Sequence, residues 1–190
     1  MSRVGRLIVF AAPAGGGKTT VIRAVRAKHP EWLFSCSATT RAPRPGEVHG
    51  QDYYFLSRED FLARVTSGEF LEYEDVHGNF YGTLRTIVDE ALNKGETMVL
   101  DLDVKGAASI KRHYPDALTI FIKPPSLEVL KERLVKRGTE SAEVVAKRIA
   151  RAEMELAQAD KFDCVIVNNE IDQAVADVLR CIEHGRATAN

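Results

Sequence analysis

The segment FAAPAGGGKTT, residues 10–20, carries the clearest chemical signal in the sequence. Its three consecutive glycines, Gly15 to Gly17, let the backbone curl closely around an anion with successive N–H groups pointing inward. Lys18 can then reach the β- and γ-phosphates of a nucleotide, and the hydroxyl of Thr19 can bind Mg²⁺. The spacing predicts a phosphate-binding loop between a strand and a helix; a merely flexible glycine turn is the alternative.

One position departs from the usual G-x-x-x-x-G-K-[ST] pattern, because Ala12 stands where the first glycine is expected. If that position required a positive φ, alanine would cost about 1 kcal/mol, an amount that a fold tolerates. We therefore expect the loop to bind a nucleotide.

Two aspartates close the apolar run TMVLDLD, residues 97–103. Asp101 and Asp103 are two apart, so on a strand they point to the same side. Open α/β sheets bind ligands at the carboxyl ends of their strands. One aspartate is expected to help hold Mg²⁺ through water and the other to face a second substrate; a solvated strand end is the alternative.

A second anion-binding set lies on the loop SATTRAPRPGEVHGQDYYF, residues 37–55. Two prolines brace this loop around Arg41 and Arg44, and Tyr53 follows. Two guanidiniums and a phenol suit a bidentate phosphate clamp, whereas the alternative is a solvated, charged surface loop.

The segment GEFLEYEDVHGNFYGT, residues 68–83, offers four carboxylates: Glu69, Glu72, Glu74 and Asp75. A carboxylate can accept two parallel N–H bonds, which guanine presents at N1 and N2. Adenine has an acceptor at N1 and would leave the carboxylate unpaired, at a cost of ~1 to 3 kcal/mol. Spacing does not choose among the four acids.

The elements that position these groups alternate between apolar runs and helical periods, which predicts an α/β fold with a parallel sheet. The expected strands are Arg6 to Ala11, Thr97 to Asp103, Leu118 to Ile122 and Cys164 to Asn168. The expected helices are Lys18 to Lys28, Thr83 to Asn93, Val104 to His113, Ser126 to Lys136, Ser141 to Gln158 and Ile171 to His184.

The region from Leu33 to Gly82 does not follow this alternation. Its predicted strands are short and contain both aromatic and polar residues. One helix, Ser57 to Val65, is expected among them, with Ser57 as its N-cap. We interpret the region as an inserted antiparallel subdomain.

Composition limits the function classes. The chain has 190 residues, 45% hydrophobic and 28% charged, as in an ordinary globular protein. A net charge of -1 gives no global reason to bind nucleic acid or a membrane surface, although residues 123–151 hold eight Lys or Arg against four Glu. No apolar stretch approaches the ~20 residues of a membrane span, and the apolar start reads as a buried strand, so we expect a cytoplasmic protein.

The three cysteines are Cys36, Cys164 and Cys181. They are odd in number, far apart and without C-x-x-C spacing, so we expect reduced, buried thiols. The histidines form no metal-binding pair, and any metal is expected on oxygen ligands. The sequence leaves the oligomeric state open, a homo-oligomer included.

With these motifs in place, the sequence resembles the guanylate kinase family, bacterial type, across essentially the whole chain. The segments that carry the resemblance are APAGGGKTT, SATTRAPRPGEVHGQDYYF, GEFLEYEDVHGNFYGT, LDLDVKGA, and LVKRGTES followed by KRIARAEME. Bacterial members commonly have alanine at the first loop position, as Ala12 here. Ala14 stands where serine is usual, so we expect a modest effect on ATP binding, and Ala38 replaces a second serine beside Ser37.

The resemblance implies transfer of the γ-phosphoryl group of ATP to GMP, and also to dGMP, with Mg²⁺. It implies one domain over residues 1–190, with a P-loop NTPase-like parallel sheet flanked by helices. Its parts would be a core (1–32, 84–125 and 159–190), an inserted mixed antiparallel GMP-binding subdomain (33–83) and a helical lid (126–158).

The resemblance also assigns residues. Catalytic positions would be Lys18, Arg41, Arg44, Arg137 and Arg148. ATP would contact Ala12, Pro13, Ala14, Gly15, Gly16, Gly17, Lys18, Thr19, Thr20, Arg133, Arg137 and Asn168. GMP would contact Ser37, Arg41, Arg44, Tyr53, Glu72, Tyr81, Thr83, Asp101 and Asp103, with Glu72 selecting the base. Thr19 and Asp101 would hold Mg²⁺.

Two alternatives remain at this stage. A non-catalytic guanylate-kinase-like module would use the same fold to bind proteins, although such modules often lack a working loop and this chain keeps Lys18 and Thr19. A kinase for another nucleoside monophosphate, such as AMP or UMP, would differ in its acceptor.

Overall fold

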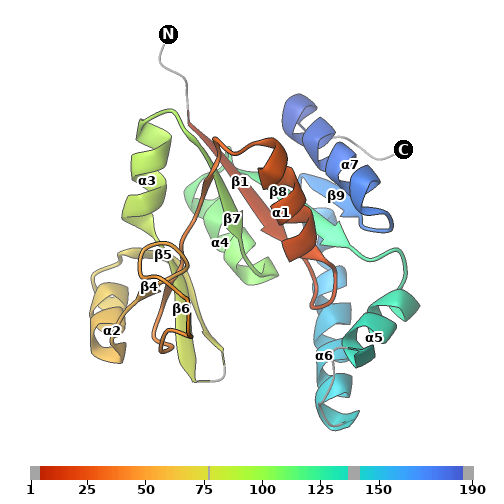
Figure 1. Cartoon of the computed structure of the whole chain (residues 1–190), viewed down its shortest axis with the longest axis horizontal. Coiled ribbons are helices and arrows are strands. Elements are labelled where there is room, and N and C mark those ends of the chain that lie inside the picture. The colour runs from red at the N-terminus through yellow and green to blue at the C-terminus, as the bar shows by residue number, and fades with distance from the viewer. Residues whose placement is uncertain (1–4, 77, 137–141, 186–190) are drawn as a thin grey trace.

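The larger of two sheets forms the centre of the molecule. Its strands are β1 (Arg6–Ala11), β2 (Leu33–Phe34), β7 (Thr97–Asp101), β8 (Leu118–Lys123) and β9 (Cys164–Val167). The computed structural model describes residues 5–76, 78–136 and 142–185 and pairs these strands in parallel in the order β2-β7-β1-β8-β9 (Figure 1). The predicted parallel α/β sheet is thereby confirmed.

Helices cover both faces of this sheet, because both faces of its strands are apolar. They are α1 (Lys18–Lys28), α3 (Arg85–Asn93), α4 (Val104–His113) and α7 (Ile171–His184). Ile8 and Phe10 of β1 pack in one core with α1 and α7. Leu7 and Val9 point the other way, into a core shared with α3 and α4. The sheet therefore forms a rigid platform between two helical layers (Figure 1).

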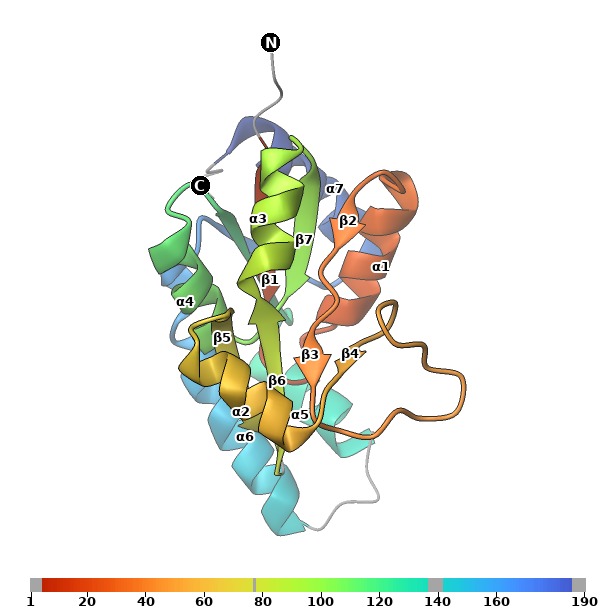
Figure 2. The ribbon, with the colours of Figure 1, turned by 90° about the vertical axis from the view of Figure 1, so that its left-hand side faces the viewer.

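The second sheet projects from one end of the first (Figures 1 and 2). Its strands are β3 (Ala38–Thr39), β4 (Tyr54–Phe55), β5 (Phe70–Val76) and β6 (Asn79–Leu84), and α2 (Arg58–Thr66) packs against it. The order is β4-β3-β6-β5, with β3 and β4 parallel and the other pairs antiparallel. Ser57 caps α2 by accepting a hydrogen bond from the backbone N–H of Asp60 at 3.0 Å, as predicted.

Two further helices, α5 (Leu127–Lys136) and α6 (Ala142–Leu156), extend from the same end of the central sheet as the second sheet (Figure 1). Leu130 and Leu134 of α5 pack with Ala152 of α6 in a small core. Ala14 of the glycine loop packs against this core. A 3-10 turn, η1 (Ala159–Lys161), follows α6 and leads toward β9.

Two of the predicted boundaries that are wrong fall on candidate site residues. The strand expected to run to Asp103 ends at Asp101, because the Asp103 carboxylate instead caps α4 and accepts the N–H of Gly106 at 2.7 Å. The helix expected from Thr83 begins at Arg85, because Thr83 lies in β6 and pairs with Glu72 of β5. The two aspartates therefore do not share one strand face.

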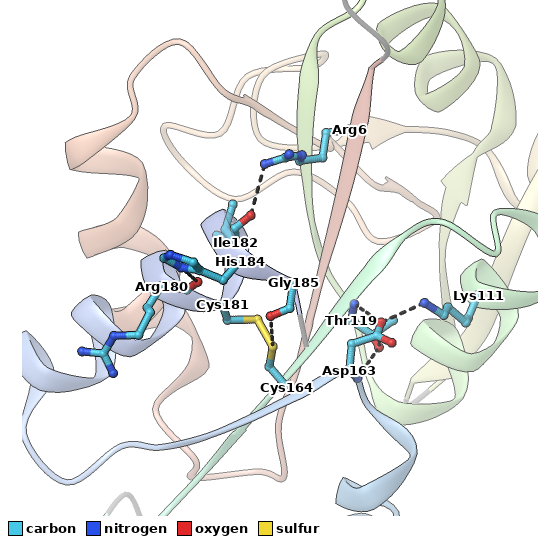
Figure 3. Close-up of a disulfide and its surroundings, with 10 residues drawn as sticks. All are labelled: Arg6, Lys111, Thr119, Asp163, Cys164, Arg180, Cys181, Ile182, His184 and Gly185. Carbon is cyan, nitrogen blue, oxygen red and sulfur yellow. Dashed lines mark hydrogen bonds and ion pairs between the residues drawn. A yellow bond between two sulfur atoms is a disulfide. The ribbon is translucent and has the colours of Figure 1, made fainter. Parts of the chain in front are cut away.

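The prediction of reduced cysteines is also wrong for two of the three. Cys164 of β9 and Cys181 of α7 form a disulfide, with Cα atoms 6.5 Å apart (Figure 3). Both are buried, whereas the free Cys36 is only partly buried. The sequence separation of 17 gives no spacing signal, because the fold, not the local sequence, brings β9 beside α7.

Polar contacts tie the same region together (Figure 3). The Asp163 carboxylate accepts from Lys111 of α4 at 2.8 Å and from the backbone N–H of Thr119 at 2.9 Å. Arg6 donates to the carbonyl of Ile182 at 3.2 Å. These bonds link β1, β8, α4 and α7, which supports the platform behind the site.

Candidate functional site

The glycine loop joins β1 to α1 in the conformation that an anion-binding loop needs. Gly15 and Gly17 adopt φ values of 84° and 86°, in the region that favours glycine, and α1 begins at Lys18. A methyl group at Gly17 would overlap the side-chain amide of Asn168. That amide donates to the carbonyl of Gly16 at 3.0 Å, so the end of β9 supports the loop from outside.

Lys18 is held at the end of β7. Its ammonium lies 2.6 Å from a carboxylate oxygen of Asp101 and also donates to the carbonyl of Leu102. Both Lys18 and Asp101 are partly buried, so their attraction is less screened than that of a surface pair. The predicted lysine and aspartate therefore meet at one point, although they are far apart in sequence.

Two residues at this junction carry oxygen atoms suited to Mg²⁺. Thr19 is exposed in the first turn of α1, and Asp101 ends β7. Mg²⁺ prefers carboxylate, hydroxyl, water and phosphate oxygens, so this donor set fits it. Among the described residues, no group of three or more His, Cys, Asp or Glu side chains lies close enough together to bind a metal by itself.

Ala12 and Ala14, the two departures in the loop, both make apolar contacts. Ala12 is buried in the core that contains α1 and α7. Ala14 contributes to the small core of α5 and α6. Pro13 is buried beside them, and its carbonyl accepts the N–H of Gly16 at 2.9 Å. Thr20 is exposed in the first turn of α1.

Arg41 lies at the end of β3 among groups that fix its direction. It forms a two-bond pair with Glu47, with N–O distances of 2.9 and 2.8 Å. Its guanidinium also lies over the ring of Tyr53, 5.3 Å from the centroid, and Tyr53 contacts Tyr81 edge to face. Hydrogen bonding to Glu47 raises the pKa of Arg41, and burial raises the pKa of Tyr53. Sequence reasoning brought Arg41, Tyr53 and Tyr81 together and missed Glu47.

Arg44 and Ser37 flank this cluster. Arg44 is exposed, and its backbone N–H donates to Glu47 at 2.7 Å. Ser37 precedes β3 and is partly buried, and its carbonyl accepts the N–H of Tyr54 at 2.9 Å. Glu47 therefore holds both the side chain of Arg41 and the backbone of Arg44. In the sequence, only its position six residues after Arg41 pointed to this role.

Glu72 and Asp103 meet around a small pocket between β5 and α4. The pocket has a volume of about 300 Å³ and is lined by Glu72, Glu74, Asp103 and Gly106, among others. Thr83 donates to Glu72 at 2.6 Å. A methyl group at Gly106 would lie 3.2 Å from Asp103 and 3.3 Å from Glu72, so glycine leaves room for both carboxylates.

Burial raises the pKa of Glu72, and the neighbouring Asp103 adds to this effect. Burial and Asp103 likewise raise the pKa of Glu74. Of the four acids that spacing left open, Glu72 and Glu74 line the pocket, whereas Glu69 pairs with Arg64 and Asp75 caps the β5–β6 turn through Gly78.

The remaining predicted cations come from α5 and α6. Arg133 donates to the backbone carbonyl of Asn168 at 3.4 Å, which brings it near the loop. Arg148 lies on α6, and Arg137 lies outside the described residues. Asn168 is buried and its amide is directed to the loop carbonyl.

Arg151 of α6, counted in the basic cluster but not among the site residues, reaches Glu74 at 3.3 Å and Asp103 at 3.5 Å. Its position three residues after Arg148, on the same helix face, was the only sequence signal for it. Across the described parts of the chain, no helix is both long and apolar enough to cross a bilayer.

Comparison with known proteins gives a consistent result. The family profile described as "Guanylate kinase" matches residues 4–185. The guanylate kinase of Chlorobium luteolum is 48% identical over 189 residues, which cover 99% of this chain and 96% of that protein. The guanylate kinase of Gloeobacter violaceus is 49% identical over 179 residues, covering 94% and 87%. The crystal structure of guanylate kinase from Anaplasma phagocytophilum superposes with a TM-score of 0.75 at 31% identity, over 98% of this chain and 89% of that one.

Proposed function

Because the chain belongs to the guanylate kinase family, we propose that it transfers the γ-phosphoryl group of ATP to GMP and releases ADP and GDP. The observation that best supports this function is the pair of contacts made at the end of β7. There Asp101 holds the lysine of the phosphate loop, and two residues later Asp103 lines the pocket that contains Glu72. One short segment thus joins a phosphate-binding site to a site suited to a base.

Loop residues 12–20 would hold the phosphates of ATP. The backbone N–H groups around Gly15 to Gly17 and the positive end of α1 favour an anion, and Lys18 adds a full charge. Arg133 lies close to the same loop. Asn168 would act on ATP through the loop that it supports.

Arg41, Arg44, Tyr53 and Tyr81 would hold the phosphate of GMP. Arg41 contacts Tyr53, Tyr53 contacts Tyr81, and Arg44 follows Arg41 on the same loop, where its backbone N–H donates to Glu47. Arg41 is already oriented by Glu47. A planar guanidinium held in this way can offer two parallel N–H bonds to a phosphate.

The guanine of GMP would occupy the pocket beside Glu72. Its N1–H and N2–H groups are donors, and Glu72 and Asp103 are acceptors. Thr83 and Ser37 complete the polar groups proposed around the base. An adenine would present an acceptor to Glu72 and leave that carboxylate unpaired, which costs about 1–3 kcal/mol.

The main barrier is repulsion between two phosphate groups. The acceptor is already an oxyanion, so the reaction needs no strong general base. A pair of unit charges at 4 Å costs about 4 kcal/mol at an effective dielectric of 20, and multiply charged phosphates increase this several-fold. Lys18, Arg41, Arg44, Arg137 and Arg148 are proposed to offset that repulsion and to align the groups.

We also propose Mg²⁺ as the metal that accompanies ATP, with Thr19 and Asp101 as its protein-side oxygen donors, directly or through water. When bound, Mg²⁺ would neutralise part of the charge on the phosphates.

The three parts of the chain are proposed to move toward one another when both substrates bind. They are the core (1–32, 84–125 and 159–190), the GMP-binding insert (33–83) and the lid (126–158). The first two residues of that insert, Leu33 and Phe34, form β2 and pair into the central sheet, so they move with the core. Closure would exclude water from the transferring group. We propose the cytoplasm as the location, where burial of the Cys164–Cys181 disulfide would slow its reduction by small thiols.

A coupled ADP-release assay with GMP, dGMP, AMP and UMP tests the function. We expect turnover with GMP and dGMP and little with the other two. Lys18→Ala should abolish turnover while the far-ultraviolet circular dichroism stays unchanged. No ADP release with GMP would leave a non-catalytic binding module as the better interpretation, and faster turnover with AMP or UMP would reassign the acceptor.

A further inference from the structure

Arg151 connects three segments that are distant in sequence. It lies on α6, and one guanidinium nitrogen is 3.3 Å from Glu74 of β5 and 3.5 Å from Asp103, the N-cap of α4. A second nitrogen donates to Glu155, one turn along α6, at 3.0 Å. The bond to Glu155 holds the Arg151 side chain against its own helix, so its free edge is aimed at the other two carboxylates.

The contacts of Arg151 lie at the edge of a groove. A groove of about 940 Å³ lies between α4 and α6, and Glu74, Asp103 and Arg151 are among its lining residues. Ala152 of α6 is buried in the small core that α6 shares with α5. Arg151 therefore links the lid helix to the insert beside an open groove.

Two of the three partners of Arg151, Glu74 and Asp103, also line the 300 Å³ pocket proposed for the base. One oxygen of Asp103 accepts from the N–H of Gly106, and the other faces Arg151, so the carboxylate is fixed from two sides. Glu74 and Asp103 are close enough to repel each other when both are charged, and the guanidinium offsets that repulsion.

We propose that Arg151 is a positioning residue for base recognition, which holds Asp103 and Glu74 in place and makes their arrangement depend on the lid helix. This inference rests on the proposed function of the pocket. Guanine would then be recognised by carboxylates whose orientation includes a contribution from α6. Base binding and lid position would be coupled through one side chain.

If Arg151 only stabilised the fold, its replacement would lower the unfolding temperature. The positioning role predicts instead a change in GMP binding. Arg151 is 56% exposed, and exposed ion pairs contribute little to stability. Arg151→Gln should therefore leave the unfolding temperature nearly unchanged. Its effect should fall on GMP and not on ATP.

The test compares Arg151→Gln and Arg151→Lys with a matched control, Lys147→Gln. Lys147 lies on the same helix in an exposed pair with Glu143. We expect Arg151→Gln to raise the KM for GMP about fivefold or more, a size typical of side chains coupled in one salt-bridge network. The kcat and the KM for ATP should stay within about twofold of the wild type. Arg151→Lys should restore part of the loss, and Lys147→Gln should match the wild type. Calorimetric titration with GMP should show the same order of affinities.

A double-mutant cycle with Glu74→Gln isolates the contact. We expect the two substitutions to be non-additive in kcat/KM for GMP, because each removes the same pair. Additive effects, an unchanged KM in Arg151→Gln, or an equal change in Lys147→Gln would overturn the proposal. A wild-type enzyme that fails to phosphorylate GMP would contradict the proposed function instead, so the two failures are distinguishable.

Discussion

Replacement of Glu72 by glutamine tests base selection with little change in shape. Glu72 is partly buried beside Asp103 and accepts a hydrogen bond from Thr83 at 2.6 Å. Glutamine keeps one oxygen acceptor but places an N–H₂ group where guanine also presents a donor. One charge-assisted bond is lost and a guanine donor is left without a partner.

The expected magnitude follows from these two losses. A hydrogen bond to a charged group contributes about 1.5–3 kcal/mol, and an unpaired buried donor costs about 1–3 kcal/mol. Partial relaxation leaves a loss near 3 kcal/mol, which corresponds to about a 100-fold decrease in kcat/KM for GMP. The KM for ATP should stay unchanged, because Glu72 lies in the base pocket and not at the glycine loop.

A coupled ADP-release assay measures this change with GMP and with inosine monophosphate, which lacks the N2 amine. The wild type should prefer GMP, and Glu72→Gln should reduce that preference. Thr83→Val is the comparison, because it removes the hydroxyl that donates to Glu72 but keeps the carboxylate; a loss of about fivefold is expected for one neutral bond. If Glu72→Gln keeps the wild-type kcat/KM for GMP within about twofold, the assignment of Glu72 is wrong.

Three further predictions follow from burial, close contacts and the cross-link. Burial raises the pKa of Glu72, so at pH 7 the charged carboxylate destabilises the folded protein. Glu72→Gln removes this charge and should raise the unfolding temperature in calorimetry at pH 7. The gain should disappear below about pH 4.3, where Glu72 is protonated in both the folded and the unfolded chain. Gly17→Ala should weaken ATP binding in calorimetric titration by about tenfold or more, because a methyl there meets Asn168, whereas Gly68→Ala, also at positive φ but with open space around it, should only reduce stability by about 1–2 kcal/mol. Cys181→Ala should lower the free energy of unfolding in urea by about 3 kcal/mol while kcat stays within twofold, and a reduced wild type should behave alike.

Much of the fold could be predicted because the apolar strands are short, nearly continuous and separated by helical periods. The bounds of α1, α4 and α7 agree with the sequence prediction. Errors arose at polar junctions. Asp103 was placed in a strand because it closes a nearly unbroken apolar run, but its carboxylate instead caps a helix.

The candidate site was predictable where one short motif carries the chemistry, as for Gly15 to Lys18. It was not predictable where a contact joins distant segments. Arg151 meets Glu74 and Asp103 only after three elements pack, and the disulfide forms only because α7 packs beside β9. The residue roles themselves stay predictions that the variants above test.

The pairing of Lys18 with Asp101 gives substrate entry a particular character. The ammonium already has a carboxylate partner 2.6 Å away, so a triphosphate bound at the loop as proposed would compete with that partner for Lys18. Part of the electrostatic gain on binding would then be offset by loss of the Lys18–Asp101 pair, which would moderate the affinity for the nucleotide. The same exchange would free the Asp101 carboxylate for the metal ion proposed to accompany ATP.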